Sequence, residues 1–339
     1  MKRIIEYFKN NRKQSYLKTQ YKNQYAFVGI GNHSIHNLYP VLQYLRVPIK
    51  YIVVNSKKNA ELINISFSGI ISTNNFETIL NDPEINGIFI CASPQSHFDL
   101  IKKGLEHNKN IFVEKPPCTT ENELYELIKL EKESNVFCMV GMQKRYAPVT
   151  NLLKNHLHNS VISYNYRFVT GTYPEGDSLL DIFIHPLDFV TYLFGDFEIA
   201  SIQISQKNSF FIHLAHKSFV GTIELSTLYS WKNAEETLII NTDSGIYKMK
   251  NMEYLSFEKK SKTFFTIPVE KIKKIDQQIQ ILHSRNNFNP IMENNQIVTS
   301  GYFSELKTFI NLCETGKGNN HSTLSDLKPT YNIIKKIKK

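Results

Sequence analysis

The sequence predicts an α/β protein whose N-terminal half is a Rossmann-type, doubly wound parallel sheet. Three observations support this prediction: an apolar strand that runs into a glycine-rich turn near residue 29, regular alternation of strand and helix patterns up to about residue 140, and a length of 339 residues. The alternation indicates parallel strands joined by helices. The length exceeds the size at which single cores usually divide, so we expect two domains.

The first strand–helix–strand unit has the pattern of a dinucleotide site. An apolar strand over 24–28 leads into the glycine turn, and a helix through 38–45 and a strand over 49–54 follow. In such a unit, backbone N–H groups of the turn approach a pyrophosphate at the start of the helix. Ser34 stands where a third Gly or Ala is usual, so the turn alone is a weak signal. The residues expected to contact the cofactor here are Gly29, Gly31, Asn32 and His33.

The next predicted strand is a continuous apolar run over 86–92, as expected of a parallel strand buried on both faces. Its end loop holds Ser93, Pro94 and His97, and a helix over 98–107 follows. In open α/β sheets, ligands bind at the carboxyl ends of the strands. These three loop residues are therefore candidates for cofactor contacts.

Glu114 and Lys115 end a further apolar strand, and the two prolines that follow stop its ladder because they lack an N–H. Lys115 therefore lies at a strand's carboxyl end, where a chemical role is favoured over that of a solvated lysine. A helix over 121–134 and a strand over 136–140 continue the alternation.

A second segment supplies an aspartate and a histidine. Asp181 and His185 are four residues apart, which places them on one face of a helix. Histidine titrates near neutrality and is a common general base, and an aspartate beside it can orient its ring. On spacing alone, a hydrogen-bonded surface pair is the more common outcome.

These motifs occur in the order seen in the Gfo/Idh/MocA family of glucose-fructose oxidoreductase, inositol dehydrogenase and rhizopine-catabolism proteins. The chain resembles this family from about Tyr25 to Leu327. The resemblance implies an NAD(P)-binding Rossmann domain and a second α/β domain whose large open, mostly antiparallel sheet covers the substrate and often forms a homodimer or homotetramer interface. It rests on the glycine turn, the loop of Ala92-Ser93-Pro94 with His97, Glu114-Lys115-Pro116, Val140-Gly141 leading into Lys144-Arg145-Tyr146, and Asp181 four before His185.

The end of the second strand departs from the family pattern. Many NAD-preferring members have an acidic residue there that binds the ribose hydroxyls, whereas this chain has Asn55, Ser56, Lys57 and Lys58. An acid would repel a 2′-phosphate, while a hydroxyl and two ammonium groups attract it. The sequence therefore favours NADP(H) over NAD(H), with no metal. The alternative is that the two lysines are a solvated helix start.

The resemblance also implies roles in hydride transfer. His185 is the expected base for a substrate hydroxyl, and Asp181 orients its ring or shares the proton relay. Lys115 donates to the substrate oxygen and stabilises the developing alkoxide. Together with the Ser93 loop, Glu114 and Lys115 are also expected to contact the cofactor.

Four residues are candidates for substrate binding. Arg145 and Tyr146 follow the presumed crossover between the domains, although Arg145 is equally well explained as a structural salt-bridge partner. Tyr166 and Arg167 lie in an alternating run over 161–169, so one of them should face the site and the other should point away. The alternation does not say which.

The net charge of +9 is concentrated at the two ends of the chain. Residues 1–22 hold seven Lys/Arg and one Glu, or +6, and residues 328–339 hold five Lys, or +5, which leaves −2 for the rest. A near-neutral body argues against a nucleic-acid groove. The N-terminal stretch lacks the apolar core of a signal peptide. It is expected to be a solvated helix or arm, with docking to an anionic membrane surface or a partner as the alternative.

Composition indicates a cytoplasmic protein. No segment has the ~18 consecutive apolar residues of a membrane span. The four cysteines have no metal-type spacing and are expected to be reduced thiols.

We expect four regions: a basic extension over 1–22, the NAD(P)-binding domain over 23–143, a substrate-binding and oligomerisation domain over 144–327, and a basic C-terminal helix or tail over 328–339. In the third region, a helix is predicted over 302–313. Alternating or apolar runs predict strands over 199–204, 210–214, 219–228, 237–241, 246–249, 254–257 and 263–269.

The expected function is that of an NAD(P)-dependent oxidoreductase acting on a CH–OH group of a sugar. The resemblance extends this to a nucleotide-linked sugar destined for a surface polysaccharide. Two alternatives are a reductase of a small non-sugar carbonyl or imine, and a non-catalytic sensor that binds a dinucleotide. The set of Lys115, Asp181 and His185 argues against the sensor.

Overall fold

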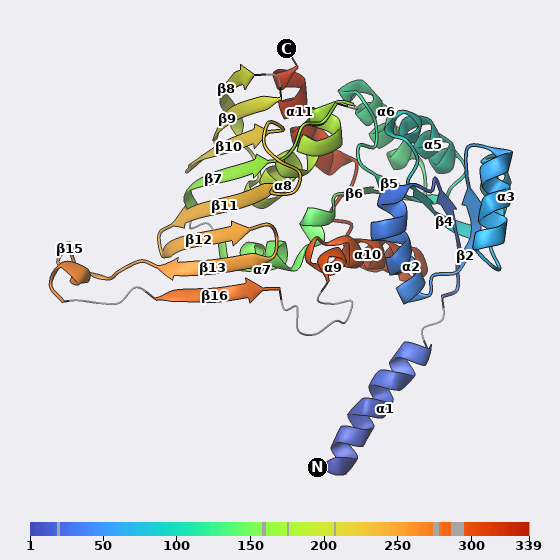
Figure 1. Cartoon of the computed structure of the whole chain (residues 1–339), viewed down its shortest axis with the longest axis horizontal. Coiled ribbons are helices and arrows are strands. Elements are labelled where there is room, and N and C mark those ends of the chain that lie inside the picture. Colours follow the sequence, from blue (N-terminus) through green and yellow to red (C-terminus); the bar gives the residue numbers. More distant parts are fainter. Residues whose placement is uncertain are drawn as a thin grey trace.

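A six-stranded parallel sheet forms the N-terminal half of the protein (Figure 1). The computed structural model describes residues 1–18, 21–157, 161–174, 176–206, 208–273, 278–285 and 295–338. The strand order is β3-β2-β1-β4-β5-β6, so the chain reverses its winding direction between β1 and β4. This confirms the predicted doubly wound sheet. The strands are β1 (Gln24–Val28), β2 (Ile49–Val53), β3 (Ile71–Thr73), β4 (Ile85–Ile90), β5 (Asn110–Glu114) and β6 (Cys138–Gly141).

Helices cover both faces of this sheet. Alternate strand residues face two separate cores because successive side chains point to opposite faces. One core lies under α5 (Pro94–Glu106) and α6 (Glu121–Glu133). The other lies under a π-helical turn (Ser34–Leu38), α2 (Tyr39–Leu45) and α3 (Lys57–Ser66), and the short α4 (Glu77–Leu80) precedes β4.

A helix from the far end of the chain completes the second core. In α10 (Tyr302–Thr315), the ring of Phe309 lies 5.1 Å from that of Phe89 and 5.8 Å from that of Phe112. Aromatic pairs at these distances add to the stabilisation from burial alone. Helix α10 therefore joins the C-terminal region to the Rossmann sheet.

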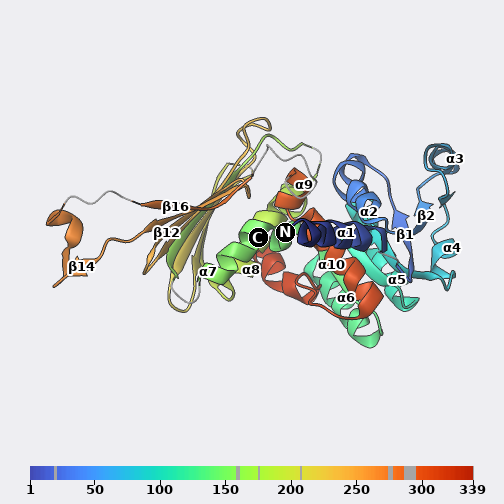
Figure 2. The ribbon, with the colours of Figure 1, turned by 90° about the horizontal axis from the view of Figure 1, so that it is seen from below.

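An eight-stranded sheet forms the second half, and helices α7 (Pro148–Leu157) and α8 (Ile184–Phe194) pack on one of its faces (Figure 2). Its order is β16-β13-β12-β11-β7-β10-β9-β8, and every pairing is antiparallel except that of β7 with β10. This confirms the open, mostly antiparallel sheet. The strands are β7 (Val161–Val169), β8 (Glu198–Gln206), β9 (Ser209–Ala215), β10 (Val220–Ser226), β11 (Glu235–Thr242), β12 (Gly245–Lys250), β13 (Tyr254–Lys259) and β16 (Ile279–Ser284).

One predicted strand differs in the structure. The run over 263–269 forms two strands of two residues, β14 (Thr263–Phe264) and β15 (Ile267–Pro268), in a hairpin outside the large sheet. Proline ends the second strand because it has no N–H to donate to a ladder. The strand β16, absent from the sequence prediction, takes the edge position instead.

The two basic ends differ in their packing. The N-terminal helix α1 (Lys2–Lys18) extends away from the body, whereas α11 (Lys328–Ile337) packs against α8 and α6 (Figure 1). The short helix α9 (Gln296–Thr299) precedes α10, and a 3-10 turn (Ser325–Leu327) precedes α11. Lys339 lies outside the described residues. In the described part of the chain, no helix is long and apolar enough to cross a membrane.

Candidate active site at the carboxyl edge of the parallel sheet

A cavity of about 580 Å³ opens where the strand order reverses, at the carboxyl ends of β1, β2 and β4. This is the position at which open α/β sheets bind their ligands. Four of the residues predicted to bind the cofactor line it: Gly29, Gly31, Asn55 and Ser93. The remaining lining residues are Val28, Ile30, Val53, Val54, Asn59, Cys91, Ala92, Ser96 and Leu100.

The glycine turn leaves room for a ligand. Gly29 has φ +86°, and a Cβ there would lie 2.7 Å from backbone atoms of Cys91 and Ala92, so only glycine fits. A Cβ on Gly31 would meet no protein atom within 4 Å and would project into open space. Ser34, which replaces the usual third small residue, holds the turn because its hydroxyl bonds both the N–H and the carbonyl oxygen of Gly31, each at 3.0 Å.

The end of β2 contributes an amide to the cavity. The Asn55 side chain accepts a hydrogen bond of 3.0 Å from the side chain of Asn59, and both residues line the cavity. Ser56 caps α3, accepting from the Asn59 N–H at 3.2 Å, and Lys57 is an exposed residue of its first turn. Ser56 and Lys57 thus begin α3, directly after Asn55 in the chain.

His97 does not line this cavity. It is buried, and its two ring nitrogens lie 2.7 Å from the carbonyl oxygen of Pro116 and 2.9 Å from that of Ala92. The ring thus ties together the loops that follow β4 and β5. Pro94 occupies the first turn of α5, where proline needs no N–H partner.

Asn32 and His33 lie beside the cavity, not in its lining. The carbonyl oxygen of Asn32 lies 2.6 Å from a ring nitrogen of His36. His33 Nε2 lies 3.5 Å from Oε1 of Glu114, at the end of β5. That buried carboxylate oxygen has no hydrogen-bond partner. Since buried polar atoms are normally paired, the orphaned oxygen and the open space at Gly31 fit a polar cofactor lying across these strand ends.

Lys115 and His185 meet beside this edge. Lys115 Nζ donates to the main-chain oxygen of Asp181, and burial lowers its pKa although the carboxylates of Glu114 and Asp181 act in the opposite direction. Burial also lowers the pKa of His185 well below the usual value, as do Lys115, Lys144 and, least, His33. Two ionisable groups that act on one another and both have lowered pKa values are typical of a catalytic site.

The expected hydrogen bond between Asp181 and His185 is absent from the described structure. The Asp181 carboxylate accepts from the hydroxyl of Tyr173 at 3.2 Å, and the buried Nδ1 of His185 has no partner. Residues Leu179–Phe183 form a π-helical turn, whose wider winding removes the four-residue stacking of an α-helix. Asp181 instead reaches the site through its main-chain oxygen.

A second cavity, of about 290 Å³, lies against the large sheet and includes a residue that the sequence analysis missed. Lys144 lines it and donates to Oε2 of Glu236, whose Oε1 accepts from the hydroxyl of Tyr166 at 2.7 Å. Tyr166 is fully buried and reaches the cavity only through Glu236. Lys144 also acts on His185, so this cavity lies close to the pair of Lys115 and His185. Its other lining residues are Asn37, Gln143, Phe168, Ala234, Glu235, Asn251, Met252, Gln296, Ser300 and Tyr302.

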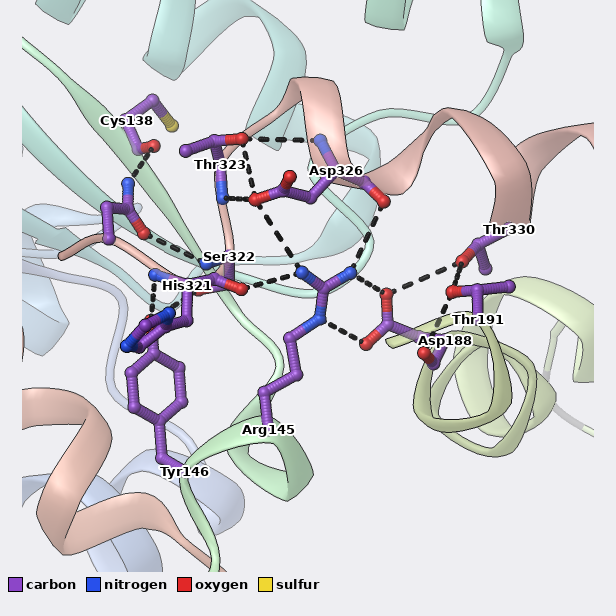
Figure 3. Close-up of polar contacts among 11 residues, drawn as sticks. Cys138, Arg145, Tyr146, Asp188, Thr191, His321, Ser322, Thr323, Asp326 and Thr330 are labelled. Atoms are coloured by element: carbon purple, nitrogen blue, oxygen red, sulfur yellow. Dashed lines mark hydrogen bonds and ion pairs between the residues drawn. The ribbon is translucent and has the colours of Figure 1, made fainter. Parts of the chain in front are cut away.

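Arg145 makes the salt bridge that the sequence allowed as the alternative to substrate binding (Figure 3). Its side chain is 3% exposed, and it makes two charge-assisted hydrogen bonds to Asp188, of 2.8 Å from Nε and 2.5 Å from a terminal nitrogen. The other terminal nitrogen donates to the His321 carbonyl oxygen at 2.6 Å. Arg145 therefore joins the loop after β6 to α8 and to the C-terminal segment.

Tyr146 and Arg167 are also placed away from the second cavity. The buried hydroxyl of Tyr146 accepts from the His321 N–H and lies within hydrogen-bonding distance of Ser322 Oγ, both at 3.1 Å (Figure 3). Arg167 is 38% exposed and pairs with Glu224 at 3.0 Å and Glu235 at 3.1 Å. Strand alternation thus turns Tyr166 inward and Arg167 outward.

Known proteins share this architecture. Residues 23–142 match the model of the Gfo/Idh/MocA oxidoreductase family, described as its NAD-binding Rossmann fold. The scyllo-inositol 2-dehydrogenase (NAD(+)) of Bacillus subtilis is 32% identical over 136 residues, which cover 37% of this chain and 40% of that protein. The chain matches at most about half the length of such curated relatives.

Solved structures match over nearly the whole chain. A dehydrogenase from Clostridium difficile superposes with a TM-score of 0.78 at 19% identity, covering 93% of this chain and 99% of that one. Levoglucosan dehydrogenase in complex with NADH and levoglucosan gives a TM-score of 0.74 at 16% identity, covering 91% and 94%. At these identities the likeness establishes the fold. The family match over 23–142 shows that this part of the chain is similar to the NAD-binding Rossmann domain of the Gfo/Idh/MocA oxidoreductases.

Proposed function

We propose that the protein is an NAD(P)-dependent oxidoreductase that transfers a hydride to or from a hydroxyl or carbonyl carbon of a sugar-type substrate. One observation carries the proposal: Lys115, which donates to the Asp181 main-chain oxygen, and Lys144, which lines the smaller cavity, both act on His185. A dinucleotide sensor needs the cavity but has no need for these three side chains.

Two of these side chains, His185 and Lys115, account for the proton chemistry. A bound nicotinamide cofactor supplies the hydride donor or acceptor. In the oxidative direction, His185 takes the proton of the substrate hydroxyl, and its Nε2 is the available atom because Nδ1 is buried. Its lowered pKa keeps the ring neutral and able to accept that proton. Lys115, fixed by the Asp181 main-chain oxygen, donates to the substrate oxygen and stabilises the developing alkoxide. The roles reverse in the reductive direction.

The cofactor is proposed to be NADP(H). Among the described residues that line the larger cavity none is acidic, and Asn55 occupies the end of β2 where an acid would repel a 2′-phosphate. Asn55→Asp should shift the ratio of NADPH to NADH affinity toward NADH. An unchanged ratio would contradict this choice.

The substrate is proposed to be a sugar or a nucleotide-linked sugar, with a role in surface polysaccharide synthesis. The smaller cavity is lined mainly by amide, hydroxyl and charged side chains, together with Phe168. A polyhydroxylated ring needs many such donors and acceptors, and its apolar face packs on an aromatic ring. The levoglucosan and inositol dehydrogenases among the similar proteins act on compounds of this class, according to their names.

A second copy is the proposed partner, held through the large sheet. The face away from α7 and α8 exposes Phe211, Val220 and Ile239 at 40%, 60% and 43%. Exposed apolar side chains on one sheet face are typical of an interface. Light scattering should give at least a dimer for the native protein and a smaller species for Val220→Asp/Ile239→Asp; identical masses would contradict this assignment.

The activity is tested with Lys115→Met and His185→Gln, assayed on a panel of sugars and nucleotide sugars with NADP⁺ and NADPH. Each substitution should lower turnover by about 10²–10⁴-fold while NADPH binding stays within about twofold, because neither side chain lines the larger cavity. The matched control is Lys102→Met, which removes an exposed ion pair with Glu126. Full turnover in either active-site variant would contradict the assigned roles.

A further inference from the structure

The N-terminal helix presents an uncovered apolar stripe. Met1, Ile4, Ile5 and Phe8 follow the spacing of one helical face, and they are 98%, 60%, 49% and 68% exposed. The main-chain oxygen of Met1 accepts from the N–H groups of Ile4 and Ile5 at 3.1 Å, so Met1 belongs to the same helical turn. Figure 1 shows the helix extending away from the body. These side chains therefore do not contribute to the protein's own core.

Positive charge borders this stripe. Residues 1–18 carry six Lys/Arg and a single acid, Glu6. Lys2 and Lys9 border one edge of the apolar face, and neither takes part in an ion pair in the described structure. The aromatic ring of Tyr7, 64% exposed, stands beside that of Phe8 at 6.2 Å. An apolar face edged by cations and aromatic rings suits the boundary between lipid headgroups and acyl chains.

The basic C-terminal helix provides an internal contrast. Lys335 pairs with Glu121 at 2.5 Å, Lys338 pairs with Asp177, and the apolar face of α11 is buried through Ile333, Ile334 and Ile337. Two of its lysines and its apolar face thus have partners within the protein. Helix α1 has a similar composition, but over residues 1–11, whose side chains the structure describes, its large apolar side chains are exposed.

We infer that α1 docks the protein on an anionic lipid surface, lying in the plane of the interface with Met1, Ile4, Ile5 and Phe8 toward the acyl chains. Nucleic acid would match the charge but offers no apolar phase for the stripe. The helix has 17 residues, or about 25 Å of length, and no helix in the described residues qualifies as a membrane span, so it lies on the surface. Such docking would place the oxidoreductase site next to a membrane and is independent of the chemistry proposed for it.

The test is flotation of the full-length protein with vesicles of phosphatidylglycerol and phosphatidylcholine, and with vesicles of phosphatidylcholine alone. The native protein should float with the anionic vesicles only, and less as NaCl is raised, because exposed charges are screened by salt. Ile4→Ser/Phe8→Ser and Lys2→Glu/Arg3→Glu should each lower the partition coefficient by about tenfold or more.

A charge-matched control separates α1 from net charge. Lys217→Glu/Lys317→Glu makes the same charge change at exposed lysines of the body and should partition within about twofold of the native protein. Unchanged thermal unfolding of every variant confirms that the fold is intact. Absence of flotation with anionic vesicles, or native-like flotation of Ile4→Ser/Phe8→Ser, would overturn the inference. Neither result would bear on cofactor binding, which is measured separately without lipid.

Discussion

Replacement of Arg145 by alanine should destabilise the protein strongly without removing a substrate contact. The side chains of Arg145 and Asp188 are 3% and 2% exposed, and two hydrogen bonds of 2.8 and 2.5 Å join them. Without the guanidinium, the Asp188 carboxylate keeps only a long hydrogen bond of 3.4 Å from Thr330. Breaking a buried ion pair from one side costs about 3–5 kcal/mol, a large part of the 5–15 kcal/mol that stabilises a typical protein.

The assay is urea unfolding followed by circular dichroism, with Arg167→Ala as the matched control. Arg167 also makes two ion pairs, but it is 38% exposed, so its loss should cost less than about 1 kcal/mol. The double variant Arg145→Met/Asp188→Leu should recover most of the lost stability, because no buried charge is left unpaired. An Arg145→Ala protein that unfolds like the native one, while its KM for substrate rises at least tenfold, would refute this reasoning and restore Arg145 as a ligand.

Three further predictions concern the cavities and the base. Gly29→Ala should lower the free energy of unfolding by about 1–3 kcal/mol and weaken dinucleotide binding, since φ of Gly29 is +86° and the added Cβ would clash with the Ala92 backbone. A variant that unfolds and binds like the native protein would contradict this. Lys144→Met should raise the KM for substrate more than tenfold with NADPH affinity unchanged, because Lys144 lines only the smaller cavity; an unchanged KM would place the substrate elsewhere. Because the pKa of His185 is lowered, kcat/KM for oxidation should fall on the acid side only below pH 6.5. The free energy of unfolding should also decrease as the pH drops below 6.5, since the unfolded chain binds the His185 proton before the folded chain does. A fall in kcat/KM that begins above pH 6.5 would contradict the role of His185 as the base.

The fold was predictable where one face or both faces of a strand are buried. Strands such as β4 read as continuous apolar runs because helices cover both sides of the parallel sheet. The packing of α10 on that sheet was not predictable, since Phe309 and Phe89 are separated by more than two hundred residues. No local pattern encodes which helix fills such a position.

Within the site, sequence patterns identified the chain segments better than the side chains. Gln143–Tyr146 form a 3-10 turn, in which successive side chains diverge by about a third of a turn. Lys144 therefore faces the cavity while Arg145 faces Asp188, and both fit the same motif. The π-helical turn before His185 has no sequence signal either, and neither has the hydrogen bond that the Asp181 carboxylate accepts from Tyr173.

The cofactor cavity is the foundation of the proposed chemistry, and a fluorescence titration of the purified protein with NADPH and NADH in parallel tests it most directly. The account predicts saturable binding of a dinucleotide, tighter for NADPH, and a loss of binding in Gly29→Ala. Folded protein, free of carried-over cofactor, that binds neither dinucleotide would contradict it.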